Sequence, residues 1–297
     1  MNVVVAASNM SLSKNTWSSY RTAENHIKRC EQETGIRMRF PMTNRMILGY
    51  VGWLISERRV AANSISQYLS GLRVAHLKNG VLPPNLRPDI ITAIIKGRQN
   101  EASHKTQIPR MAMTIPVMKL LHFLLKQSNL PIQKKRLIWT VSTMAFHGSF
   151  RIHELLSRKE KEFDHTTTLL GCNINEVTIE LDGKIEDFLT IFLKSPKEDK
   201  LCGGVTVELF STGTVTCPVS AWKKWLAVRK ISIRRAGPAF CMDNGACYTG
   251  NQFNKDIKSL LSPHINYNER KYLSHSFRAG MASMMAKAAY RDEEIMR

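Results

Sequence analysis

The chain has 297 residues, of which 43% are hydrophobic, so it is long enough to bury one large core or two ordinary ones. No apolar run approaches the roughly 20 residues that a membrane-spanning helix needs, which excludes a protein built on such helices. Its 43 Lys and Arg residues against 24 Asp and Glu residues give a net charge of +19.

The excess of basic residues is shared by both halves of the chain. Residues 1–105 carry 15 basic and 6 acidic side chains, and residues 106–297 carry 28 and 18. Two basic halves predict a surface that follows a polyanion, for which double-stranded nucleic acid is the commonest partner. The alternative is a protein that merely has a basic composition. The sequence shows no basic amphipathic helix that would indicate binding to a membrane surface. Its six cysteines lack the paired spacing of a metal site, so we expect reduced thiols and no metal or cofactor.

Apolar residues recur at helical spacing through the first hundred residues. Turn and cap residues divide the pattern into four predicted helices: from Thr16 to a stop at Gly35, from Thr43 to Ile55, from Asn63 or Ser64 to Asn79, and from Asp89 to Gly97. We therefore predict a compact helical domain over residues 11–100. Residues 101–113 lack a sustained period and are interpreted as a linker.

The remaining residues, 114–297, mix helical patterns with one β-rich stretch. Helices are expected from Thr114 to Leu125 and over 133–146, then from Cys217, from Asn251 to Leu261, and from Ser274. Between them, residues 177–181, 188–193 and 205–210 are rich in β-branched and aromatic residues, and turn residues separate them. The predicted fold class is mainly α with a small antiparallel sheet.

Two short basic motifs lie far apart in this second part. In the first, a Gly148-Ser149 turn leads into Arg151 and Glu154, whose i and i+3 spacing places them on one helix face. The second contains His275 and Arg278, which have the same spacing near a helix start. Each pair could be an ordinary solvated surface. Together they offer two guanidinium groups and an imidazole, which suit a phosphate group.

A third basic group falls in the turn between the second and third predicted strands. This turn contains Lys194 and Lys197, and a lysine at a hairpin tip can protonate a leaving oxygen. Lysine-rich hairpin tips are also common solvated features. The order is thus arginine, hairpin lysine, and then His-x-x-Arg, behind a basic helical domain.

In this order the motifs resemble the tyrosine recombinases, or phage integrase family. The sequences Gly-x-x-Arg-x-x-Glu-Leu-Leu, Ser-x-Lys-x-Asp-x-x-x-Gly-Gly, Cys-Pro-Val and His-Ser-Phe-Arg-x-Gly are most similar to eukaryotic Crypton-type or DIRS-type mobile elements. The resemblance covers residues 11–297 and implies a SAM-like core-binding domain followed by a recombinase-like catalytic domain. It implies a nuclear location if the chain comes from a eukaryotic element, and a cytoplasmic one otherwise.

The resemblance also implies site-specific DNA recombination and integration, without metal or ATP. A tyrosine attacks the phosphate, and a 5′-hydroxyl of the partner strand later reverses the step. Arg151 and Arg278 would hold the phosphate oxygens, and Lys197, or alternatively Lys194, would be the general acid. His275 would assist proton transfer, and Glu154 would hold the pocket's geometry from outside it.

The nucleophile is the part of the motif that this sequence does not supply. In the family it lies roughly thirty residues beyond the second arginine, whereas Arg297 is only 19 residues beyond Arg278. Tyr290 lies in between, but it falls where the family's helix ends, so we do not expect it to be the nucleophile. The sequence therefore suggests a catalytic domain that is incomplete at its C-terminus and inactive alone.

DNA contacts are also expected from the helical domain. The helix with Arg73 and Lys78 would face a groove, and Lys96 and Arg98 would lie near the backbone, with Lys194 adding a contact from the second domain. The resemblance also implies a homo-oligomer, the tetrameric synapse of the family, on DNA if the C-terminal tail were present. The alternative function is a catalytically inactive DNA-binding protein derived from a mobile-element recombinase.

Overall fold

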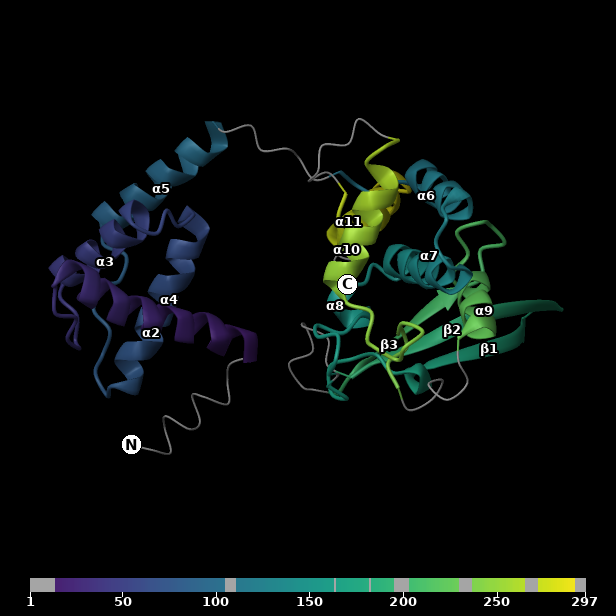
Figure 1. The fold of residues 1–297 in the computed structure, drawn as a ribbon, viewed down its shortest axis with the longest axis horizontal. Helices are drawn as coiled ribbons and strands as arrows, with labels where there is room; N and C mark the ends of the chain where they lie inside the picture. The colour runs from purple at the N-terminus through teal and green to yellow at the C-terminus, as the bar shows by residue number, and fades with distance from the viewer. Residues whose placement is uncertain are drawn as a thin grey trace. The chain divides into compact units, whose positions relative to one another are not determined.

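The computed structural model describes residues 14–104, 111–162, 164–181, 183–194, 203–229, 237–264 and 272–291. The chain divides into two compact units, residues 1–107 and 108–297 (Figure 1). Within the described residues, no helix combines the length and the apolar character needed to cross a membrane.

The first unit consists of helices packed around one core. Their bounds are α2 (Lys14–Thr34), α3 (Asn44–Ser56), α4 (Ala62–Lys78) and α5 (Asp89–His104). Thr43 caps α3, because its hydroxyl accepts the Met46 N–H at 3.3 Å. Gly35 and Gly80 follow α2 and α4 with φ values of +69° and +72°, a region that favours glycine and ends a helix.

A buried histidine ties α4 to the segment before α3. His76 is fully buried, its Nε2 accepts the backbone N–H of Met42 at 3.0 Å, and its Nδ1 lies 2.8 Å from the carbonyl oxygen of Leu72. The Nδ1 atom must therefore carry the proton, because Nε2 is the acceptor. Both ring nitrogens are satisfied, which allows this polar side chain to lie inside the core.

The second unit combines helices with a small sheet (Figure 1). Its elements are α6 (Ile115–Gln127), α7 (Ile132–His147), α8 (Ile152–Leu155), the short 3-10 helix η1 (Gly171–Asn173), β1 (Ile174–Leu181), β2 (Lys184–Leu193), β3 (Val205–Phe210), α9 (Pro218–Val228), α10 (Gly250–Leu261) and α11 (Ser274–Lys287).

The three strands form an antiparallel sheet in the order β1-β2-β3. Leu189 and Ile191 of β2 are completely buried, and they face the core together with Leu209 of β3. Helix α9 contacts β2 and β3, and α7 packs on α9 and α11. The fold is thus mainly helical with a small antiparallel sheet, which confirms the expected fold class.

The structure differs from the sequence expectations at several element ends. Helix α5 continues to His104 instead of ending at Gly97, and β1 begins at Ile174, three residues before the predicted strand. Met113, assigned to the linker, is fully buried in the core of the second unit. The end of α5 was missed because its last residues are polar and show little helical periodicity. The burial of Met113 was missed because one buried residue in a short segment leaves no periodic pattern.

Candidate functional site

The turn after α7 places Arg151 at the edge of the second unit's core. Helix α7 ends at His147, and Gly148 follows it with φ −90°. A Cβ on Gly148 would lie 2.7 Å from Cδ2 of the buried Phe150 ring, so this close approach requires glycine. Ser149 takes the left-handed conformation, with φ +50°. The strained residue is thus the serine, and the glycine makes room for the aromatic ring.

Arg151 is oriented by Glu154 within the short helix α8. The Glu154 carboxylate accepts the Arg151 backbone N–H at 2.7 Å and its Nη1 at 3.2 Å. The two side chains are 28% and 14% exposed. The predicted pair is therefore formed in the structure, and the carboxylate fixes both the backbone and the guanidinium group of Arg151.

Arg278 reaches the same turn from α11. Its Nη1 donates to the carbonyl oxygen of Ser149 at 3.0 Å, although the two residues lie 129 positions apart. Because Ser149 is two residues before Arg151, the hydrogen bond brings both predicted arginines to one turn. Arg278 is half-buried, so the protein surroundings limit the positions of its guanidinium group.

Two hydrogen bonds position the start of α11. The Met113 N–H donates to the carbonyl oxygen of Ser276 at 2.8 Å, and the Ser274 N–H donates to Oδ1 of Asn254 on α10 at 2.8 Å. His275 is exposed in this first turn, three residues before Arg278. The i, i+3 spacing places His275 on the same face of α11 as Arg278.

The sequence interpretation did not include His153. This residue is the second of α8, and its ring lies against the start of α10, where a Cβ on Gly250 would come 3.0 Å from its Cε1. The residue is exposed, but its packing against α10 removes part of the ring from water, which lowers its pKa, and the charges of Arg158 and His275 lower it further. The only sequence signal was its place two residues after Arg151.

The two candidate lysines differ in what the structure shows. Lys194 follows β2, is exposed, and donates from Nζ to the carbonyl oxygen of His165 at 3.1 Å. Lys197 lies outside the described residues. The choice between them as general acid therefore stays a prediction.

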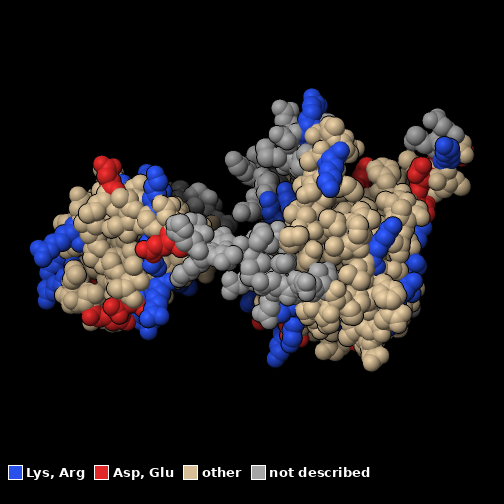
Figure 2. All heavy atoms as spheres, turned by 90° about the horizontal axis from the view of Figure 1, so that it is seen from above, with Lys and Arg blue, Asp and Glu red and all other residues tan. Residues whose placement is uncertain are grey.

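The four basic residues singled out in the first unit have different surroundings. Lys78 pairs with Glu24 at 2.5 Å and lies over the ring of Trp17, and Arg98 pairs with Glu101 at 2.9 Å. Arg73 on α4 and Lys96 on α5 are exposed. A DNA backbone would have to compete with Glu24 for Lys78. Lys and Arg side chains also lie spread over the visible face of each unit (Figure 2).

Tyr290 lies beyond the end of α11. It is 53% exposed and follows Ala289, which has φ +61°. The nine residues from Arg278 to the helix end at Lys287 span about 13 Å along the axis. Tyr290 therefore lies well away from Arg278 along the helix, and its exclusion as the nucleophile stays a prediction.

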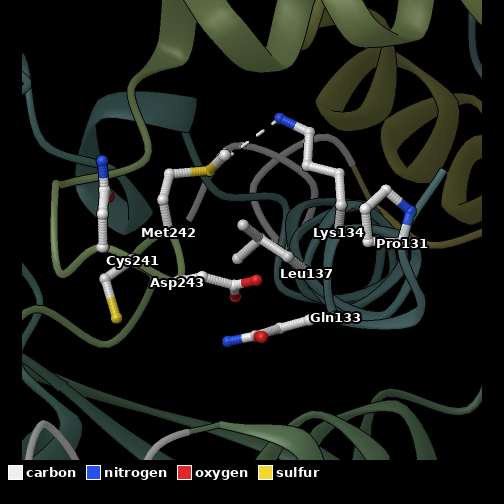
Figure 3. Close-up of a pocket in the computed structure, with 8 residues that line it drawn as sticks. Pro131, Gln133, Lys134, Leu137, Cys241, Met242 and Asp243 are labelled. Atoms are coloured by element: carbon white, nitrogen blue, oxygen red, sulfur yellow. Dashed lines mark hydrogen bonds between the residues drawn. The ribbon is translucent and has the colours of Figure 1, made fainter.

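A cavity of about 420 Å³ lies elsewhere in the second unit, between the start of α7 and the loop that follows Cys241 (Figure 3). Lys134 lines it and is held by Asp256 at 2.6 Å and by the face of the Tyr248 ring. The cavity is about 20 Å along α7 from the arginine turn, so it is separate from that site. Among the described residues, no group of three or more His, Cys, Asp or Glu side chains could hold a metal ion.

Comparisons with known proteins show which domain and which folds this chain resembles. Residues 1–81 match the phage integrase SAM-like domain. No curated protein sequence matches the chain. The structure is similar to that of the Tn1549 transposon integrase in complex with transposon right end DNA, at 12% identity and TM-score 0.57, over 96% of this chain and 84% of the integrase chain.

Two further solved structures give the same result. The XerH site-specific recombinase bound to palindromic difH substrate is 11% identical, with TM-score 0.56, over 93% of this chain and 69% of XerH. The lambda integrase dimer bound to a COC′ core site is 11% identical, with TM-score 0.52, over 95% of this chain and 67% of lambda integrase. Identities this low establish the fold alone: the chain has the fold of tyrosine recombinases, with a phage integrase SAM-like domain at its start.

Proposed function

We propose that this chain acts in site-specific DNA recombination, by cleaving and rejoining DNA strands through a phosphotyrosyl intermediate. The observation that carries the proposal is the convergence of Arg151 and Arg278 at Ser149, from segments 127 residues apart. Two guanidinium groups at one place form a site for a phosphodiester rather than a surface ion pair. A closer affinity to Crypton-type or DIRS-type elements, and with it a nuclear location, belongs to the same proposal.

The chemistry assigns each part of the site a step. A tyrosine oxygen forms a bond to phosphorus while the bond from phosphorus to the 5′-oxygen breaks, and Lys197 or Lys194 protonates the leaving oxygen. Arg151 and Arg278 stabilise the added negative charge of the transition state. His275 assists proton transfer, and a 5′-hydroxyl then attacks the phosphotyrosyl link to rejoin the strands.

Glu154 has a supporting role in this scheme. It holds the backbone and the guanidinium group of Arg151, so that the arginine is in place before the phosphate binds. Assembly of several copies on DNA completes the proposal, because recombination requires two duplexes to be held together.

A second candidate function is a DNA-binding protein that grips phosphates without cutting. The observation that favours it is the position of Tyr290, exposed and beyond the end of α11. Neither function needs a metal or a nucleotide cofactor, since the arginines supply the positive charge.

Duplex binding tests the feature that both functions share. Fluorescence anisotropy of labelled duplex DNA between about 50 and 200 mM salt should show affinity falling steeply, with a log–log slope of about 0.9 for each neutralised phosphate. Arg278→Ala should weaken binding and lower the magnitude of that slope by about 0.9. Lys224→Ala is the matched control, because Lys224 is exposed on α9 and lies near His122 instead.

Covalent trapping separates the two functions. This chain and a version extended at its C-terminus with the following codons of its gene are each incubated with nicked suicide duplexes from the flanks of the gene, and denaturing electrophoresis detects a protein–DNA adduct. An adduct that Arg278→Ala abolishes and Tyr290→Phe preserves supports recombination with another nucleophile. Binding without an adduct from either protein supports the second function, and affinity that does not change with salt overturns both.

A further inference from the structure

His153 packs on the first turn of α10. A Cβ on Gly250 would lie 3.0 Å from Cε1 and 3.3 Å from Nδ1 of the ring, so the imidazole rests directly on the helix backbone. Thr249 caps this helix, because its hydroxyl oxygen accepts a hydrogen bond from the Gln252 N–H at 3.3 Å. The ring therefore lies at the positive end of a three-turn helix dipole.

The same helix connects His153 with His275. Gly250 contacts His153, and Asn254, one turn further along α10, accepts the N–H of Ser274 at 2.8 Å. Ser274 directly precedes His275. One turn of α-helix rises about 5.4 Å, so the two histidine-bearing segments are neighbours along α10.

The arginines connect these two segments a second time. Arg278 on α11 donates to Ser149, and Ser149 leads through Arg151 into α8, where His153 lies. Helices α8 and α11 are thus joined both through α10 and through Ser149. The segments that carry the two arginines and the two histidines are therefore neighbours, and the sequence motifs had indicated only three of these four residues.

The charges around His153 determine its proton affinity. Partial burial lowers its pKa, and the charges of Arg158 and His275 lower it further. Glu154 in the same short helix pairs with Arg151, the residue directly before that helix, and the first four residues of α10 carry no charge. A phosphate placed there would bring a negative charge beside the ring and would favour its protonated form.

We propose that His153 is a further residue of the phosphodiester site, which binds a phosphate oxygen of DNA and takes up a proton from solvent when the DNA binds. This inference rests on the proposed function, because the phosphate is that of the scissile DNA. It adds the imidazole of His153 to that of His275, and His153 stands at a position that the quoted motif leaves variable.

The pH dependence of duplex binding tests the proposal. Between the pKa of the free protein and that of the complex, proton uptake makes affinity fall as pH rises, by up to about one log unit per pH unit for one proton. Anisotropy with labelled duplex at constant salt, from about pH 5.5 to 8, should show this slope. His153→Gln should lower it by up to about one.

His122→Gln is the matched control for this substitution. Burial and nearby lysines also lower the pKa of His122, but its ring lies tilted against that of Trp139 on α7, with the ring centroids 4.6 Å apart. The slope should stay at the wild-type value in this variant. A His153→Gln slope equal to that of His122→Gln overturns the proposal.

A second variant moves the ring without removing it. Gly250→Ala places a methyl group 3.0 Å from Cε1, so the imidazole must shift slightly, and the slope should fall, but by less than in His153→Gln. NMR of the His153 Cε1–H in the intact chain gives a direct reading, since its pKa should rise when duplex is added. An unchanged pKa with bound duplex overturns the proposal alone, whereas no salt-dependent binding at all overturns the proposed function.

Discussion

Gly280 on α11 is a position where one added methyl group should have a large effect. An ideal Cβ there would overlap the carbonyl oxygen of Met113 and lie 2.8 Å from its carbonyl carbon and 3.0 Å from Cε2 of Phe146. Carbon atoms pack best at about 3.5–4.0 Å, so the Met113 backbone would have to move outward by roughly 1 Å. The movement would weaken the hydrogen bond from Met113 to Ser276 and loosen the packing of the buried Met113 side chain.

The expected magnitude follows from three terms. Overpacking destabilises by about 1–3 kcal/mol, and loss of the backbone hydrogen bond by about 1 kcal/mol. Alanine gains about 1 kcal/mol over glycine as a helix former. Gly280→Ala should therefore lower the free energy of unfolding of the second unit by about 1–3 kcal/mol.

Urea titration followed by hydrogen exchange of peptides from α7 and α11 measures this change apart from the first unit. Gly52→Ala is the control, because a Cβ at that exposed helix position meets nothing within 4 Å. The control should stabilise the first unit by about 0.5–1 kcal/mol and leave the second unchanged. A Gly280→Ala protein as stable as the wild type would refute the reasoning from close approach.

Two further predictions concern buried histidines. His76→Ala leaves the Met42 N–H and the Leu72 carbonyl without their ring partner and opens a cavity. It should therefore destabilise the first unit by about 2–4 kcal/mol. An unchanged urea midpoint for peptides of α4 would contradict this. Burial lowers the pKa of His147, so the unfolded chain binds more protons below about pH 6.5, and the second unit should lose stability as pH falls. His147→Gln should reduce this loss in urea titrations across that range, and an equal loss in both proteins would show that other groups cause it.

Local chemistry made the helix and strand pattern predictable. Thr43 marked the start of α3 because its hydroxyl caps the helix, and Gly35 and Gly80 marked helix ends because they take a left-handed conformation. The three β-rich runs predicted the antiparallel sheet. The end of α5 and the burial of Met113 were not predictable, because both depend on packing against residues distant in sequence.

The site shows the same division between local and distant information. The spacing of Arg151 and Glu154 predicted their pairing, which is local. The contact between Arg278 and Ser149 spans 129 positions, and only the resemblance to recombinases suggested that the two motifs belong together. The motifs did not single out His153, because its place beside the site depends on contact with Gly250, which is distant in sequence.

The convergence at Ser149 also explains why a strained turn lies beside the arginines. The left-handed Ser149 is expected to cost roughly 1–3 kcal/mol, which the surrounding packing must offset. Its carbonyl oxygen accepts from Arg278, while Glu154 accepts from Arg151. Both guanidinium groups are therefore oriented by protein oxygens when no phosphate is bound. Under the proposed function, a phosphate bound there would lose less free energy to the ordering of side chains that folding has already restricted, and the arginines would be in place to stabilise the transition state.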